Sequence, residues 1–152
     1  MLLDRWVESL PHYIRLQYDP KLEETTDILV SLYEETSKIA VFTYQMERYE
    51  ISYDGAQFVP QIRELHRILK AEQCQLAIAM VNRRLVVPHV SMDAIGQYDA
   101  LAKREDRHDF GYLVLRDTQK VLMNHINRYD DLYMSTVKDS SSTNTSTTKS
   151  TI

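Results

Sequence analysis

The fold is decided by residues 19–55, which read DPKLEETTDILVSLYEETSKIAVFTYQMERYEISYDG. The Asp-Pro pair that opens this stretch is typical of a helix start, with Asp as the N-cap and Pro in the first turn. The Asp-Gly pair that closes it is a typical helix stop. Between them apolar side chains recur at spacings of three and four, as in a coiled-coil seam. We therefore expect one helix over residues 20–53, about 50 Å long at about 1.5 Å per residue.

The composition of the whole chain supports an all-α fold. The chain has 152 residues, of which 43% are hydrophobic and 26% charged, as in an ordinary globular domain. It holds only 3 Gly and 4 Pro, too few for a turn-rich sandwich or barrel or for a glycine-rich nucleotide loop. Long helices are the architecture that remains.

Four further helices are expected around the helix over residues 20–53. One covers residues 3–18, and another begins near Pro60 and ends at Pro88. A short helix follows the N-cap Ser91, and a last one follows the N-cap Asp109. We predict an elongated bundle of four to five helices, in which residues 20–53 and 60–87 form a long antiparallel helical hairpin.

The C-terminal residues differ from the rest of the chain. Residues 137–152 are rich in Ser and Thr and contain few side chains to bury. Such a segment does not offset the entropy cost of folding. We therefore predict a helical domain over residues 1–136 and a disordered tail over residues 137–152.

Charge and cysteine content bear on the partners and the compartment. The net charge is −4, divided between an acidic segment, residues 19–54 (net −6), and a basic one, residues 55–107 (net +2). We expect these two segments to attract each other when folded. The single cysteine, Cys74, excludes an internal disulfide and a cysteine-rich zinc site.

No membrane segment or secretion signal is evident. The longest apolar run, residues 76–81, is far shorter than a membrane span, and charged residues follow the start of the chain at once. We expect an intracellular protein of the cytoplasm or nucleus, or a virion component, without membrane contact.

The sequence predicts no catalytic, cofactor-binding or metal-binding residue. No two histidines lie four residues apart, and one Glu-x-x-His pair, Glu105 and His108, is half of what a di-iron bundle needs. Cys74 lies mid-helix, without the helix N-terminus or close imidazolium that activates a thiol. We therefore expect a protein that is not an enzyme and has no small-molecule substrate.

Abundant tyrosine and an apolar half-helix indicate protein contacts. The ten tyrosines recur near helix seams, and residues 74–81 are apolar on nearly all sides. Buried core edges explain the tyrosines equally well. Six candidate interface residues follow from the pattern: Tyr33, Tyr44, Met46, Tyr49, Ile78 and Val81.

A stripe of basic residues allows a second interpretation. Five residues are candidate phosphate contacts: Arg63, Arg67, Lys70, Arg83 and Arg84. The alternative, which overall acidity favours, is that these bases meet acids of the helix over residues 20–53, namely Glu34, Glu35 and Glu47.

These observations predict a non-enzymatic assembly or adaptor subunit that binds other proteins, itself included, through helix faces. The alternative from another class is a nucleic-acid-binding or DNA-packaging subunit, of viral origin in one version, whose oligomer concentrates the basic stripe.

Two segments carry a family resemblance. Residues 8–15, Glu-Ser-Leu-Pro-His-Tyr-Ile-Arg, and residues 119–132 are similar to parts of the N-terminal dimerisation domain of the inhibitor-of-growth chromatin proteins. The resemblance covers about a fifth of the chain and implies a helical dimerisation module. The zinc finger of that family is absent from this sequence, because one cysteine cannot build it.

Overall fold

A computed structural model describes residues 25–142 of the chain. In order, they form α2 (Thr25–Ser52), α3 (Val59–Asn82), the 3-10 helix η1 (Met92–Tyr98) and α4 (Arg104–Ser142). No strand occurs among these residues, so the predicted all-α class is confirmed. The helix predicted over residues 3–18 lies outside the described residues.

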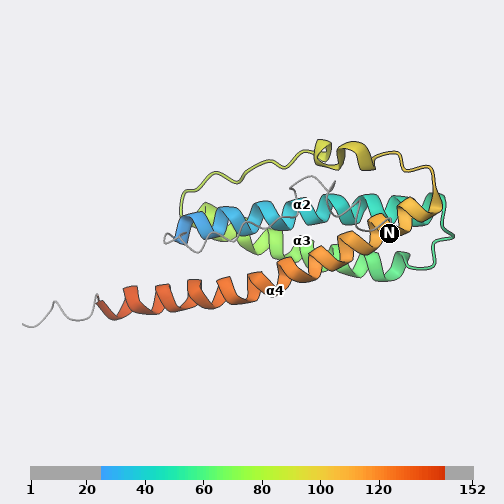
Figure 1. Cartoon of the computed structure of the whole chain (residues 1–152). Coiled ribbons are helices and arrows are strands. Elements are labelled where there is room, and N and C mark those ends of the chain that lie inside the picture. The colour runs from blue at the N-terminus through green and yellow to red at the C-terminus, as the bar shows by residue number, and fades with distance from the viewer. Residues whose placement is uncertain (1–24, 143–152) are drawn as a thin grey trace, which may run out of the picture.

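Helix α2 is the centre of the arrangement, because α3, α4 and η1 all pack against it (Figure 1). Arg63 of α3 bonds Glu47 of α2, while Gln73 of α3 bonds Ser37, which precedes Glu47 on α2. Helix α3 therefore runs back along α2. Helix α4 crosses the other two obliquely, and η1 lies on the opposite side of α2 (Figure 1).

The central position of α2 explains why so much of its surface is buried. Besides its apolar core residues, α2 buries two threonines, Thr36 and Thr43. Their hydroxyls donate to the backbone carbonyls of Leu32 and Ala40, at 2.8 and 3.0 Å, so neither hydroxyl is buried without a partner. The threonines that interrupt the apolar seam are thus compatible with burial.

Helix α3 ends earlier than the sequence predicts, at Asn82 instead of just before Pro88. Arg84 adopts the left-handed conformation, with φ 58°, and the N–H of Leu85 donates to the carbonyl of Met80 at 2.9 Å. This bond and that from Arg84 to Val81 form a Schellman motif, which closes a helix without a proline. Leu85 then packs on the cluster that contains Met80, and this contact offsets the strain at Arg84.

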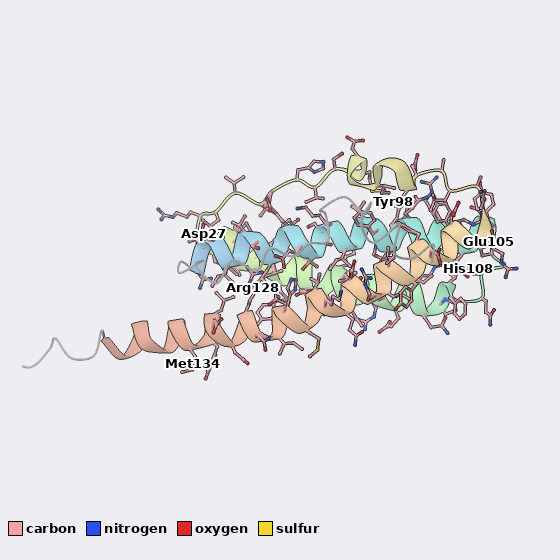
Figure 2. The ribbon with its side chains drawn as sticks, in the orientation of Figure 1. Asp27, Tyr98, Glu105, His108, Arg128 and Met134 are labelled. Carbon is pink, nitrogen blue, oxygen red and sulfur yellow. The ribbon has the colours of Figure 1, made fainter. Side chains whose placement is uncertain are left out.

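The predicted cap at Ser91 is confirmed, because its hydroxyl accepts from the N–H of Asp93. The element that follows is a 3-10 helix, kinked at Gly96, where φ is +49°. The kink turns Tyr98 into the main core, against the rings of Phe42 and Phe110 (Figure 2).

Helix α4 is longer at both ends than predicted. It begins at Arg104, five residues before the predicted cap Asp109, and the N–H of Arg107 already donates to the carbonyl of Lys103. Glu105 and Asp106 in the first turn favour this start, because acidic side chains stabilise helix N-termini. Its end at Ser142 overlaps the first six residues of the predicted tail, since extending a formed helix costs far less than nucleating one. Residues 143–152 lie outside the described residues.

Tyr49 ties the long connection between η1 and α4 to the core. Its hydroxyl donates to the carbonyl of Tyr98 and accepts from the N–H of Leu101. We expect Tyr49→Phe to lower the free energy of unfolding by about 1–3 kcal/mol, because it leaves two buried backbone groups without this partner.

Urea denaturation followed by circular dichroism measures this loss. The control Tyr53→Phe alters a largely exposed tyrosine and should change stability by less than about 0.5 kcal/mol. Equal stability of Tyr49→Phe and the unmodified chain would show that the hydroxyl does not hold this connection.

Candidate interaction surface

Helix α4 has apolar residues on two sides, and only one side faces the core. The inward side includes Phe110, Val114, Val121 and His125, which are all buried. Outside this face lie six large apolar residues that are exposed to between 49% and 68%: Tyr112, Leu115, Met123, Ile126, Tyr133 and Met134.

Four members of this exposed set lie in one line along α4 with the half-buried Leu122 and with Tyr129. We define the outer stripe of α4 as Tyr112, Leu115, Leu122, Ile126, Tyr129 and Tyr133. Successive members lie three, four or seven residues apart, and residues at these spacings share one helix face. Leu122 is half-buried against the cluster of Ile39, Leu69 and Val121, so the stripe borders the core along one edge.

The C-terminal part of α4 projects beyond the bundle (Figures 1 and 2). Its 39 residues correspond to about 58 Å, against about 42 Å for the 28 residues of α2. Leu132 still packs on the cluster of Leu29, Leu32, Leu76 and Met80, and after it the helix leaves the body of the molecule (Figure 2). Met134, which is 55% exposed, lies near the point at which α4 leaves the bundle (Figure 2).

A cluster of charged side chains fixes how α4 is rotated. His125 of α4 is 1% exposed, and its two ring nitrogens contact Glu72 of α3 and Glu35 of α2, each at 2.9 Å. Arg128, one turn further along α4, donates to both oxygens of Glu35, and the hydroxyl of Tyr129 donates to Glu72. The three long helices therefore meet at one ion cluster, whose two negative and two positive charges balance.

The pKa values in this cluster follow from its geometry. Burial alone would lower the pKa of His125, but hydrogen bonds to Glu35 and Glu72 outweigh it and raise that pKa above 6.5. Burial alone would raise the pKa of Glu35 and Glu72. The hydrogen bond from His125, together with the charge of Arg128 at Glu35 and with the charge of His125 and the hydroxyl of Tyr129 at Glu72, outweighs burial and lowers both pKa values. Because both ring nitrogens face carboxylates, this geometry favours the doubly protonated ring, in which both nitrogens donate.

A second ion pair holds the start of α4 against the end of α2. The guanidinium of Arg107 donates to both carboxylate oxygens of Asp54, at 3.0 Å each, and to the carbonyls of Leu101 and Ala102. It also lies 4.7 Å from the ring centroid of Tyr53. The hydrogen bond from Arg107 lowers the pKa of Asp54, although burial opposes it. Helix α4 is thus fixed at two points, Arg107 and His125, about five turns apart.

The six predicted interface residues fall into two groups. Tyr44, Ile78 and Val81 are exposed, and Tyr33 is half-buried. Met46 and Tyr49 lie in the core of this chain, because α2 is surrounded by the other elements. These two residues are not on the surface that the chain offers to a partner.

The five candidate phosphate contacts are all exposed, but two of them are engaged within the chain. Arg63 donates to Glu47 at 2.7 Å, as the alternative interpretation of the bases predicts, and Arg67 donates to Glu64 in two bonds. Lys70 lies in a shallow hollow with these two arginines, whereas Arg83 and Arg84 lie at the end of α3. Glu35, expected to meet this stripe, bonds His125 and Arg128 of α4 instead.

Sequence reasoning missed the outer stripe and the ion cluster. The pattern of residues 112–132 contains Tyr112, Leu115 and Leu122 in one line with Thr118 and His125, which a single apolar face would bury together. In the structure these residues do not share one environment. His125 faces Glu35 and Glu72 in the interior, while Tyr112 and Leu115 are exposed. The one sequence feature that indicates the ion cluster is the spacing of His125 and Arg128. Three residues apart, they share one face of the helix.

The described part of the chain contains neither a candidate metal site nor a candidate membrane-spanning helix. Among residues 25–142, no group of three or more His, Cys, Asp or Glu side chains is placed to hold a metal ion. Over the same residues, no helix is both long enough and apolar enough to cross a membrane.

Comparisons with protein-family models, with curated proteins and with solved structures find no match to this chain. Of the two segments that are similar to the inhibitor-of-growth proteins, residues 8–15 lie outside the described residues and residues 119–132 lie within α4. That resemblance stays a prediction, and functional inference depends on the surface and charges of the chain itself.

The ion cluster predicts a defined pH dependence of stability. Between 6.5 and the raised pKa of His125, the folded chain binds one proton more than the unfolded chain, so stability falls as the pH rises, by about 1.4 kcal/mol per pH unit. Below 4.5 stability falls as the pH decreases, because protonation of Glu35 and Glu72 removes their charge. We expect the greatest stability between these limits, in urea titrations at a series of pH values.

An exposed histidine, His89, provides a matched control for the alkaline side. His89→Gln should keep the decline above pH 6.5, since the hydrogen bonds and ion pairs of the cluster do not include His89. A free energy of unfolding that stays constant from pH 6 to pH 9 would exclude a charged, buried His125.

Proposed function

We propose that this protein is a non-enzymatic assembly subunit that binds a second copy of itself through the outer stripe of α4. The observation that carries the proposal is the line of apolar residues along α4 from Tyr112 to Tyr133, all of which are exposed except the half-buried Leu122. Contiguous apolar surface of this kind is uncommon on monomers and is typical of interaction sites.

The projecting end of α4 supports self-association in particular. A helix outside its own bundle gains its stability from a partner helix. The stripe has coiled-coil spacing and ends at Tyr133, close to the projecting end, so α4 of a second copy provides a surface of the same length and periodicity. A pair of such helices would bury the stripe of both copies in a single symmetric contact.

The ion cluster gives this surface a defined orientation. Because Glu35 and Glu72 hold His125 on the inner face, the residues on the outer face keep one position relative to the bundle. A pre-organised surface loses less conformational freedom on binding than a mobile one. By fixing the rotation of α4, the ion cluster would lower the entropy cost of binding at the outer stripe.

The exposed face of α3 is a second candidate contact in the same assembly. Cys74, Ile78 and Val81 are exposed and lie at spacings of four and three on α3. This face is separate from the outer stripe of α4, so a protein partner that binds it need not displace the second copy.

Light scattering on a sizing column, over a range of concentrations, tests self-association. We expect the full chain to form a dimer, and Ile126→Asp to raise the dissociation constant at least about tenfold, because a carboxylate would be buried in the contact. The variant should remain folded, since Ile126 is 57% exposed in the single chain.

Asn127→Asp is the matched control, because it places the same charge at the adjacent, exposed position on another face of α4. It should dimerise like the unmodified chain. A chain that is monomeric at every concentration, or an Asn127→Asp variant that is weakened as much as Ile126→Asp, would contradict this interface.

A further inference from the structure

A cavity of about 290 Å³ lies where the C-terminal end of α2 meets the N-terminal ends of α3 and α4. Its inner wall is formed by Met46 of α2 and Ile62 of α3, which belong to the main core, and by Gly111 of α4. Its rim carries three exposed apolar residues, Phe58, Tyr112 and Leu115. His108, which also lines the cavity, is labelled near the start of α4 in Figure 2.

Gly111 is the unusual member of this lining, because it lies within a long helix. Glycine is among the least favourable residues inside a helix, since its backbone loses the most freedom there. Its φ is not in the left-handed region, and a Cβ at this position would meet the Sδ of Met46 at 3.5 Å, an ordinary contact. Neither backbone geometry nor crowding therefore requires glycine here. What glycine does provide is open space at the inner wall of the cavity.

The electrostatic character of the cavity indicates an uncharged occupant. Two of its charged residues, Asp54 and Arg107, neutralise each other in a two-bond ion pair. The carboxylate of Glu50 accepts from the backbone N–H of Phe58 at 3.3 Å. The remaining wall is mostly apolar and aromatic, and an anionic ligand would lose its hydration there beside the carboxylate of Glu50.

The cavity is held open by groups that are fixed elsewhere. Tyr49, which also lines it, is anchored through its hydroxyl to Tyr98 and Leu101. The Asp54–Arg107 pair keeps the start of α4 at a set distance from the end of α2. A pocket whose walls do not have to be ordered on binding is suited to a small ligand.

From these observations we propose that this cavity binds a compact, uncharged aromatic molecule. A cavity of about 150 Å³ lined by aliphatic and aromatic residues holds one benzene ring. The space here is about twice as large and matches two fused rings. The ring of the ligand would lie against Gly111 and Met46, with Phe58 and Tyr112 closing over its outer edge. This site adjoins the proposed self-association surface, because Tyr112 and Leu115 belong to both.

Titration calorimetry of the full chain with indole tests the proposal. We expect saturable binding at one site per chain, and at least tenfold weaker binding of indole-3-acetate, which has the same rings and a negative charge. Gly111→Leu should abolish indole binding by filling the cavity. Gly111→Ala, whose added Cβ fits without a clash, should keep the fold and weaken binding at least threefold.

Ala71→Leu is the matched control, since it adds a similar side chain at an exposed position of α3 that does not line the cavity. It should bind indole like the unmodified chain. Three results would overturn the proposal: no binding of indole at millimolar concentration, equal binding to the Gly111→Ala variant, or binding that weakens as the protein concentration rises. The last result would mean that a side chain of a second copy fills the cavity.

Discussion

The arrangement of the three long helices depends on one buried charge, the imidazolium of His125 between Glu35 and Glu72. Each of the three residues comes from a different helix, and both ring nitrogens are used. Buried charges are costly unless they are paired and hydrogen-bonded, so positions of α4 that leave these carboxylates without His125 and Arg128 are strongly disfavoured. Apolar packing alone would tolerate several rotations of α4, because apolar residues surround much of that helix. The ion cluster selects one of them.

The rotation of α4 that the ion cluster selects determines which of its residues are exposed. With His125 inside, Leu115, Ile126 and Tyr133 face outward in one line, and the end of α4 continues past the body of the bundle (Figure 2). The Asp54–Arg107 pair fixes the other end of the helix and leaves the cavity beside Gly111 between its neighbours. The proposed self-association surface and the proposed ligand site are therefore both consequences of how α4 is held.

The sequence predicted the helices better than their faces. The end of α2 and the start of α3 follow from Asp-Gly and Pro60, and the Ser91 cap from its own hydroxyl, because these signals act within a few residues. The predicted start at Asp19 and Pro20 lies outside the described residues. The end of α3 depends on Arg84 in a left-handed conformation, which is uncommon for a residue other than glycine and is not visible in a sequence pattern. Likewise, His125 lies on the inner face of α4 only because Glu35 and Glu72, 90 and 53 residues away in the chain, are brought together there. Long-range pairing of this kind could not be read from local spacing.

The ionisation state of His125 tests this account most directly. Titration of its ring signals by nuclear magnetic resonance, in the folded full chain, measures the pKa without unfolding the protein. The account predicts a pKa above the ordinary value of 6.5, with both ring N–H signals protected from solvent exchange on the acidic side of that pKa. A pKa at or below 6.5, or a ring with one N–H in the folded chain at pH 6, would contradict the central role of this charge.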